Sequence, residues 1–346
     1  MLPLISQVNL IRYLIVWRVN SSLVHLSRCL ATDVSRTLAM LIAERLPTQQ
    51  ARPWRKTVQL WNSIAGDAGA ADDGEAQASP KQPASQAPAD EEAFWPAWPI
   101  EAVVWPYPGK RIYGQGEPLI WELKLLGNDA DHGLFLEVLL PAMEAAAVTS
   151  DERWHRSRTL WGRFDIDSIY VSRGPRWEPI ARGGRLDLSC RVTPVQWAEG
   201  FGEERQEKPL RRRLIWLTPF DLPVLATAAD AQDATRPARP AVPALADILE
   251  ALMERVAGLA AGKRARAEQA WALLSAEERA ALQEACAAGP VVRAELQRAD
   301  WAWPGRWIGE QTFRQIAAVL WPYLDLASIV HIGRHTHFGC GAFTLV

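Results

Sequence analysis

Apolar and polar residues alternate in some segments of the chain and recur at helical spacing in others. Strands are predicted where short or alternating apolar segments occur, over residues 2–19, 119–127, 161–171, 211–220 and 342–346. Helices are predicted where apolar positions repeat every three or four residues, from Ser21 or Ser22 to about Leu41, and over 133–147, 243–262 and about 310–324. Ser275 and Glu278 form a capping box that begins a further helix, which ends at Gly289.

These elements fall into two similar groups. A strand, a helix and a strand follow one another over 119–171, and the same order begins again at residue 211, which is half of a ferredoxin-like unit each time. Residues 66–92 lack large apolar side chains and are predicted to be a flexible acidic linker. We therefore expect an α+β protein with tandem ferredoxin-like (RRM-like) domains: a diverged N-terminal region over 1–98, part of one domain over 99–200, and a second domain over 201–346.

The amino-acid composition excludes several classes of protein for this chain. The net charge is −2 and the pI about 6.3, so any surface that binds nucleic acid has to be local. The four cysteines lie far apart without a Cys-x-x-Cys pair, which argues against a structural zinc site or a disulfide scaffold and fits a reducing cytoplasm. No apolar run is long enough to span a membrane. The candidate basic clusters are Arg153–Arg163, Arg211–Arg213 and Lys263–Arg266.

The end of the chain carries the most distinctive motif. Residues 331–341 read His-Ile-Gly-Arg-His-Thr-His-Phe-Gly-Cys-Gly, and a short apolar strand follows them. Glycines allow positive φ angles and the close approach of another chain. A loop of this composition suits a sugar-phosphate backbone, while the lack of a following helix excludes a nucleotide-binding loop.

The whole run resembles the C-terminal glycine-rich signature of CRISPR-associated pre-crRNA-processing endoribonucleases of the RAMP superfamily. The resemblance extends over 100–346, through the glycine-bounded strand at 116–127, Gly162-Arg163-Phe164 and Thr218-Pro219. It implies metal-independent cleavage of CRISPR repeat RNA by attack of a 2′-hydroxyl, without a cofactor, and retention of the product crRNA. The alternative is a non-catalytic RNA-binding subunit of a CRISPR effector complex, and a third is a RAMP relative that only contacts proteins.

The resemblance also implies which residues act. The family places its catalytic histidine near the start of the first helix, where His25 falls, with Arg28 as a cation nearby. Histidine suits proton transfer near neutral pH. The other interpretation of His25 is a partly buried helix residue without a role in catalysis.

His335 and His337 compete with His25 for the catalytic role. In an extended loop, two residues that are two positions apart point the same way and could grip one phosphate. They could equally be polar residues that lock the loop, and a metal site is disfavoured because no further ligand stands at a suitable spacing. The residues expected to contact RNA are Arg28, Arg156, Arg158, Arg163, Gly333, Arg334, Thr336, Phe338, Gly339 and Gly341.

Overall fold

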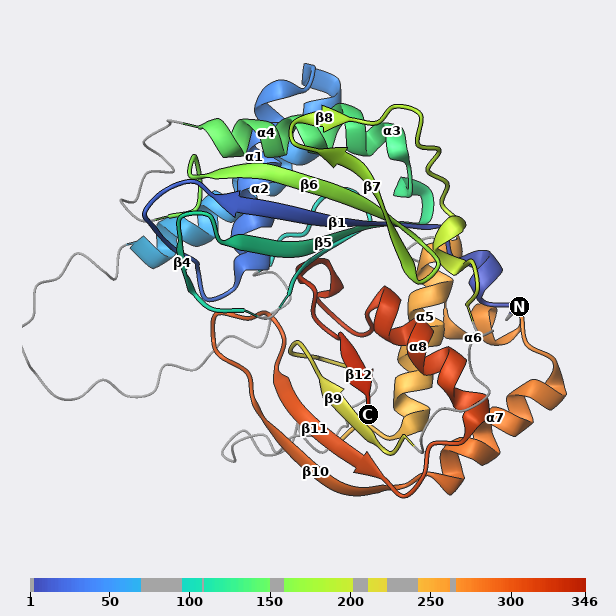
Figure 1. The fold of residues 1–346 in the computed structure, drawn as a ribbon. Coiled ribbons are helices and arrows are strands. Elements are labelled where there is room, and N and C mark those ends of the chain that lie inside the picture. The colour runs from blue at the N-terminus through green and yellow to red at the C-terminus, as the bar shows by residue number, and fades with distance from the viewer. Residues whose placement is uncertain are drawn as a thin grey trace, which may run out of the picture.

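The chain forms two α/β units, which occupy the upper and lower halves of Figure 1. This computed structural model describes residues 3–69, 95–107, 109–149, 159–201, 211–222, 242–261 and 266–346, with the side chains of 64–69 and 261 left out of the description. No helix among these residues is long and apolar enough to cross a membrane.

The N-terminal unit is built on a six-stranded antiparallel sheet. Its strands, in the order β3-β5-β1-β6-β7-β8, are β3 (Ala102–Pro106), β5 (Pro118–Leu126), β1 (Leu10–Val19), β6 (Phe164–Arg173), β7 (Arg176–Arg182) and β8 (Arg185–Leu186). Alternate residues of β1, from Ile11 to Val19, are buried in the core of the unit. The period of two that predicts a strand thus turns one face of β1 towards the helices.

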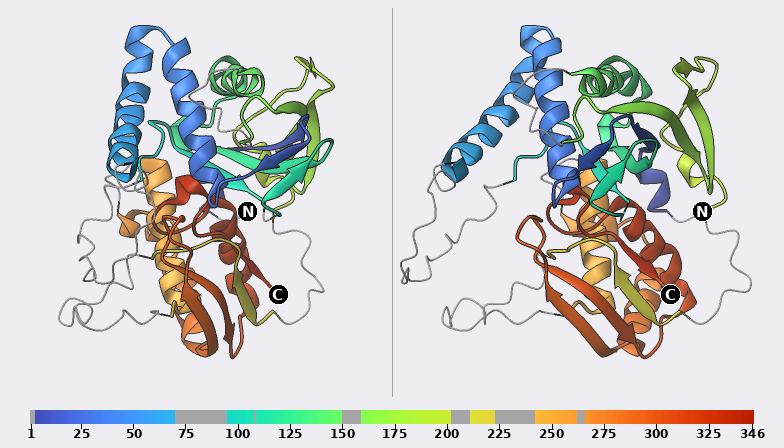
Figure 2. Two further views of the ribbon diagram at one scale, coloured as in Figure 1. Left: turned by 90° about the vertical axis from the view of Figure 1, so that its left-hand side faces the viewer. Right: turned by 60° about the vertical axis from the view of Figure 1, so that its left-hand side comes forward.

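The helices of this unit pack on one face of the sheet. They are α1 (Leu30–Arg45), α2 (Thr48–Gly69), α3 (His132–Leu134), the π-turn η4 (Phe135–Leu139) and α4 (Leu140–Val148). Figure 2 shows α1 and α2 standing together on this side. With α1 after β1 and α4 after β5, the strands β3-β5-β1-β6 have the ferredoxin-like order.

The C-terminal unit repeats that plan. Its antiparallel sheet, in the order β10-β11-β9-β12, contains β10 (Val291–Arg298), β11 (Trp307–Phe313), β9 (Arg213–Trp216) and β12 (Phe343–Leu345). Its helices are α5 (Leu245–Ala261), α6 (Ala267–Trp271), α7 (Ala276–Ala288) and α8 (Trp321–Val330). The predicted fold class, α+β with tandem ferredoxin-like domains, is confirmed.

Short elements complete the chain. A two-stranded ribbon pairs β2 (Leu23–His25) with β4 (Ile112–Gly114). The short 3-10 helices are η1 (Ile5–Gln7), η3 (Gly127–Asp129), η5 (Gln196–Ala198), η7 (Ala318–Leu320) and η8 (Thr336–Phe338). Figure 1 shows β4 on the side of the N-terminal unit where the loop between β10 and β11 reaches up towards it.

Two predicted elements are wrong. The first helix begins at Leu30 rather than at Ser21 or Ser22, because residues 23–25 pair with β4 as a strand. The helix predicted over about 310–324 is wrong at its start, because residues 310–313 belong to β11, which pairs with both β10 and β9. The 3-10 helix η7 follows at Ala318–Leu320, and α8 begins only at Trp321. The capping box of Ser275 and Glu278 is confirmed. The predicted linker falls outside the described residues from position 70 onward, and α2 continues to Gly69.

Candidate functional site

Residues 331–341, called the glycine loop below, lie between the two units. His331 and His335 adopt positive φ angles of 58° and 59°, and residues 336–338 form the turn η8. Phe338 is buried against the tryptophans Trp61 and Trp95, with ring centroids at 6.0 and 6.1 Å. The extended conformation expected for this loop is therefore wrong, and so is the alignment of His335 with His337 that depended on it.

The glycines of the loop make room for protein backbone. At Gly341 an added Cβ would collide with the carbonyl of Ile332, and at Gly339 it would come within 2.9 Å of the carbonyl oxygen of Val104. Both residues also have positive φ angles, which a side chain tolerates poorly. Close packing of backbone, within the loop at Gly341 and between the units at Gly339, is thus one reason for glycine at these positions.

His337 lies in the interior. Its Nδ1 is 2.9 Å from the carbonyl oxygen of Ala102, and its ring stands 5.1 Å from that of Trp98. Because a carbonyl only accepts, Nδ1 carries the proton, and Nε2 has no hydrogen-bond partner among the described residues. Burial lowers the pKa of His337 to about 4, so this histidine is neutral at pH 7.

Thr218 and Pro219 hold the loop in place from the C-terminal unit. The Thr218 hydroxyl donates to the carbonyl of Gly339 over 2.7 Å and accepts from the amide of Ala342 over 3.0 Å. The amide of Gly341 donates to the carbonyl of Pro219 over 2.9 Å. The Thr-Pro motif and the glycine loop, more than a hundred residues apart, therefore form one structure.

Thr218 also lines a cavity of about 170 Å³ at the junction of the units, called the cationic pocket below. Its walls come from the segment between β2 and α1, the segment between β3 and β4, and the C-terminal unit. The polar and aromatic side chains in them are Ser27, Arg28, Lys110, Arg111, Tyr107, Tyr113, Thr218 and Trp303. No carboxylate of the described residues lines the cavity, so the three cations give it a positive potential that suits a phosphate.

His25 directly precedes Leu26, which lines the cationic pocket. It ends β2 opposite Ile112, and the next residue, Leu26, donates its amide to the carbonyl of Arg111 over 2.8 Å. The His25 ring is half-buried, and its Nε2 has no hydrogen-bond partner within the described part of the chain. The position expected for His25, near the start of the first helix, is wrong, since His25 ends β2 and α1 begins at Leu30.

Arg28 bridges the two units at the rim of the pocket. Its guanidinium lies 2.9 Å from the carboxylate of Asp300 and 5.7 Å from the ring centroid of Trp301, both in the loop between β10 and β11. Trp301 is 81% exposed. The aromatic character of this loop is visible in the sequence, but its contact with Arg28 is not.

The remaining predicted contact residues are scattered. Arg334 lies 4.0 Å from the carboxylate of Asp221, which Arg306 approaches to 3.2 Å. Arg163 stands at the start of β6, where its carbonyl accepts from the amide of Asn20. Neither arginine lines the cationic pocket. The last two predicted contacts, Arg156 and Arg158, lie outside the described residues.

Lys110, Arg111, Tyr107 and Tyr113 are site residues that sequence reasoning missed. The signal available was the turn sequence Pro108-Gly109 directly before two basic residues. Gly109 passes so close to the Tyr113 hydroxyl that a Cβ at that position would approach it within 2.6 Å. Lys110 lies over the Tyr113 ring, 5.3 Å from its centroid, and pairs with Glu117 outside the pocket.

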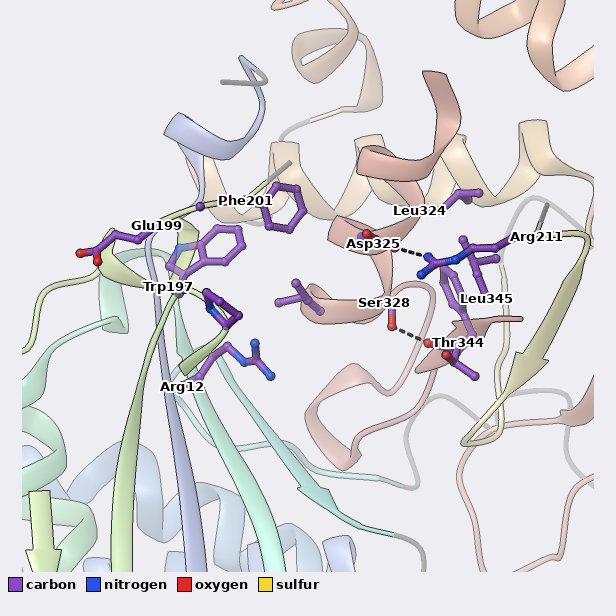
Figure 3. A pocket seen from close by; sticks show the side chains of 15 residues that line it. Arg12, Trp197, Glu199, Phe201, Arg211, Leu324, Asp325, Ser328, Thr344 and Leu345 are labelled. Atoms are coloured by element: carbon purple, nitrogen blue, oxygen red, sulfur yellow. Dashed lines mark hydrogen bonds and ion pairs between the residues drawn. The ribbon is translucent and has the colours of Figure 1, made fainter. Parts of the chain in front are cut away.

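A second and larger cavity, of about 380 Å³, also lies between the units (Figure 3). It contains two arginines, and each faces a carboxylate: Arg12 is 2.5 Å from Glu122 and Arg211 is 3.7 Å from Asp325. The described residues that line it include no histidine, cysteine or lysine. Among the described residues, no three His, Cys, Asp or Glu side chains come together as metal ligands.

Comparison with known proteins identifies the C-terminal region. Residues 217–343 match the family model of the CRISPR-associated endoribonuclease Cas6. This range begins at the residue before Thr218 and includes the whole glycine loop. No curated protein matches the chain.

Two solved structures share the fold. One is a partial Cas6-RT-Cas1–Cas2 complex, with a TM-score of 0.52 and 14% identity over 98% of this chain and 46% of that one. A Cas6-RT-Cas1–Cas2 complex has the same TM-score and identity over 98% of this chain and 29% of that one. The chain thus spans less than half the length of either neighbour, and at this identity the likeness concerns the fold. The resemblance carried by the terminal loop is confirmed by the match of residues 217–343 to the Cas6 family model.

Proposed function

We propose that this protein is an endoribonuclease that cleaves CRISPR repeat RNA at the cationic pocket. The observation that carries the proposal is the position of this pocket. Three cations line it together with Leu26, the residue after His25, and Thr218 ties the pocket wall to the glycine loop, which lies in the region that matches the Cas6 model. A scissile phosphate in the pocket would lie among the groups that its cleavage requires.

The chemistry follows from the residues present. The 2′-oxygen of the nucleotide before the cut attacks the adjacent phosphorus and loses its proton to a base. The bond to the 5′-oxygen breaks, and that oxygen receives a proton from an acid, which leaves a 2′,3′-cyclic phosphate and a 5′-hydroxyl. His25 is our candidate for proton transfer, and Arg28 and Lys110 are those that stabilise the charge developing on the phosphate oxygens. Metal independence is part of the proposal.

The rim of the pocket supports binding of an unpaired strand. Trp301 exposes its ring beside Arg28, and an exposed aromatic ring next to a cation is a stacking surface for a base. Arg334 and Arg163 are proposed phosphate contacts outside the pocket, and Arg156 and Arg158 remain predictions of the same kind. Together these contacts would hold the cleaved crRNA.

The glycine loop contributes mainly through its shape. Gly333, Gly339, Gly341, Thr336 and Phe338 pack against the protein. His337 is buried as well, and among the histidines of η8 and its cap only His335 is half-exposed. We therefore propose His335 as the loop histidine that reaches RNA, while His337 keeps the loop in position.

A second candidate is a non-catalytic RNA-binding subunit. The observation that favours it is the burial of the His25 Nε2, which needs a movement of the ribbon before it can reach a 2′-hydroxyl. The neighbours of similar fold are complexes that contain Cas1 and Cas2, so such a subunit could act within a CRISPR assembly.

A single-turnover assay on labelled cognate repeat RNA in EDTA tests both candidates. Wild type, His25→Ala and the double variant His335→Ala/His337→Ala are compared for cleavage and for RNA affinity. Cleavage that is lost only in His25→Ala, with affinity retained, supports the nuclease with its centre at the cationic pocket. Tight binding without a cut in any version contradicts the nuclease and supports the RNA-binding subunit.

A further inference from the structure

Lys124 is a lysine buried between the two units. It lies on β5 of the N-terminal unit, and its side chain is 1% exposed. Its Nζ donates to the carbonyl of Ile329 over 2.7 Å and lies 2.9 Å from the Nε2 of His331, both at the end of α8 in the C-terminal unit. The same Nζ lies 3.8 Å from the carboxylate of Glu122 and 5.0 Å from the ring centroid of Trp105.

The other ring nitrogen of His331 contacts the far end of the glycine loop. Its Nδ1 lies 3.0 Å from the carbonyl oxygen of Gly339 and 3.2 Å from that of Cys340. Carbonyl oxygens only accept, so Nδ1 carries the proton and Nε2 must accept from Lys124. Burial and the charge of Lys124 hold the pKa of His331 well below its usual range, which keeps the ring in this neutral form.

The Gly339 carbonyl is where this chain of contacts reaches the cationic pocket. It accepts from His331 on one side and from the hydroxyl of Thr218 on the other, and Thr218 forms part of the pocket wall. A path of hydrogen bonds therefore runs from Lys124 through His331 and Gly339 to Thr218.

We infer that Lys124 is a positioning residue for the proposed cleavage: by fixing the tautomer and orientation of His331 it fixes the Gly339 carbonyl, and with it the Thr218 wall of the cationic pocket. The inference rests on the proposed function. Lys124 touches neither the pocket nor any RNA placed there, and it acts through the loop. Other buried charges near it are Glu122, Arg12 and Arg255, from β5, β1 and α5.

A purely structural role for Lys124 makes a different prediction, and Arg255 supplies the control. Arg255 also joins the units, pairing with Glu101 over 2.6 Å and donating to the carbonyl of Val330 over 3.3 Å. It makes no hydrogen bond to His331 or to the glycine loop among the described residues. If Lys124 only stabilises the junction, Lys124→Met and Arg255→Met should behave alike.

The experiment compares these two variants with wild type in single-turnover cleavage of repeat RNA and in RNA affinity. We expect Lys124→Met to lower the cleavage rate by about 10- to 100-fold, as misplaced pocket groups would, while the Kd changes by less than about threefold. Arg255→Met should keep the wild-type rate at a temperature where both variants are folded. Equal rates in the two variants would overturn the inference.

A second measurement uses the wild-type protein and needs no variant. The ¹⁵N signals of the His331 imidazole should report a proton on Nδ1 and a hydrogen-bonded, unprotonated Nε2. A proton on Nε2 would overturn the relay, even if Lys124→Met does not fold. Failure of wild type to cut RNA would contradict the proposed function, and the relay is then judged on the imidazole signals alone.

Discussion

The two cavities between the units differ in size and in charge, and the smaller is the better candidate site. The larger, of about 380 Å³, pairs its two arginines with the carboxylates of Glu122 and Asp325. The cationic pocket, of about 170 Å³, is lined by three cations and, within the described part of the chain, by no carboxylate, and Leu26, the residue after His25, lies in its wall. The carboxylates that pair with Arg28 and Lys110, those of Asp300 and Glu117, stand outside the lining of the smaller cavity. Its wall therefore presents cations without a carboxylate among them, which suits an anionic ligand.

The sharpest test of this comparison is the loss of His25. His25→Ala should lower the single-turnover rate by about 10²- to 10⁴-fold, the usual contribution of a proton-transfer group, with little change in RNA affinity. His132→Ala is the matched control, since His132 is also half-buried in the N-terminal unit but bonds to Tyr13 away from the pocket. A wild-type rate in His25→Ala would remove the catalytic role from the cationic pocket.

The second prediction concerns His337 in the glycine loop and the pH dependence of its contribution to the free energy of unfolding. The pKa of His337 is about 4 in the folded protein and about 6.5 when unfolded, so the unfolded chain binds more protons between these values. The contribution of His337 to stability is therefore full above pH 6.5 and is lost as the pH falls towards 4, by roughly 3 kcal/mol.

Urea unfolding at several pH values, for wild type and His337→Gln, measures this contribution. The difference between the two unfolding free energies should shrink as the medium becomes more acidic. A difference that is constant from pH 7.5 to pH 4.5 would contradict a buried neutral His337. Because His331 remains in both proteins, its own titration cancels in the comparison.

Charge removal at the rim compares the two cavities directly. Arg28→Ala/Lys110→Ala should weaken binding of repeat RNA and flatten its salt dependence. The slope of log K against log salt should change by about 0.7 for each phosphate on a single strand that the variant no longer neutralises. Arg211→Ala, in the larger cavity, should leave that slope unchanged. The reverse pattern would make the larger cavity the RNA site.

The smallest effect on RNA binding is expected for substitution of the exposed residue Trp301. Trp301→Ala should weaken binding by about 1–3 kcal/mol if one base stacks there, and Trp301→Phe should restore part of it. Repeat RNA with a single 2-aminopurine near the cut would report stacking through quenched fluorescence. Leu188→Ala, at another highly exposed apolar residue, serves as the control. Unchanged quenching in Trp301→Ala would exclude this stacking contact.

Local patterns predicted most of the fold. The apolar stripe over 243–262 becomes α5, which buries the face that the spacing defines. The apolar run around 119–127 becomes β5, which is buried on both faces over residues 121–126, and the capping box at Ser275 begins α7. The helix expected over about 310–324 failed because β11 gains its ladder from β10 and β9, which local spacing does not reveal. Tertiary pairing overrode the local pattern there.

The site was less predictable for the same reason. His25 and the terminal motif were noticeable from residue type, yet the contact between Arg28 and Asp300 joins positions that are 272 apart in the sequence. The role of the glycines also depends on packing, since Gly339 faces Val104 from the other unit. Residue types indicated the chemistry, and only the junction of the two units brings the pocket residues together.

The burial of Phe338 has a consequence for how this protein is made. Phe338 belongs to the core of the N-terminal unit, although the chain reaches it only after the C-terminal sheet and helices. During synthesis the first unit therefore cannot complete its core until nearly the whole of these 346 residues has left the ribosome. Until then, Trp61 and Trp95 lack the aromatic ring that packs against both of them in the folded protein.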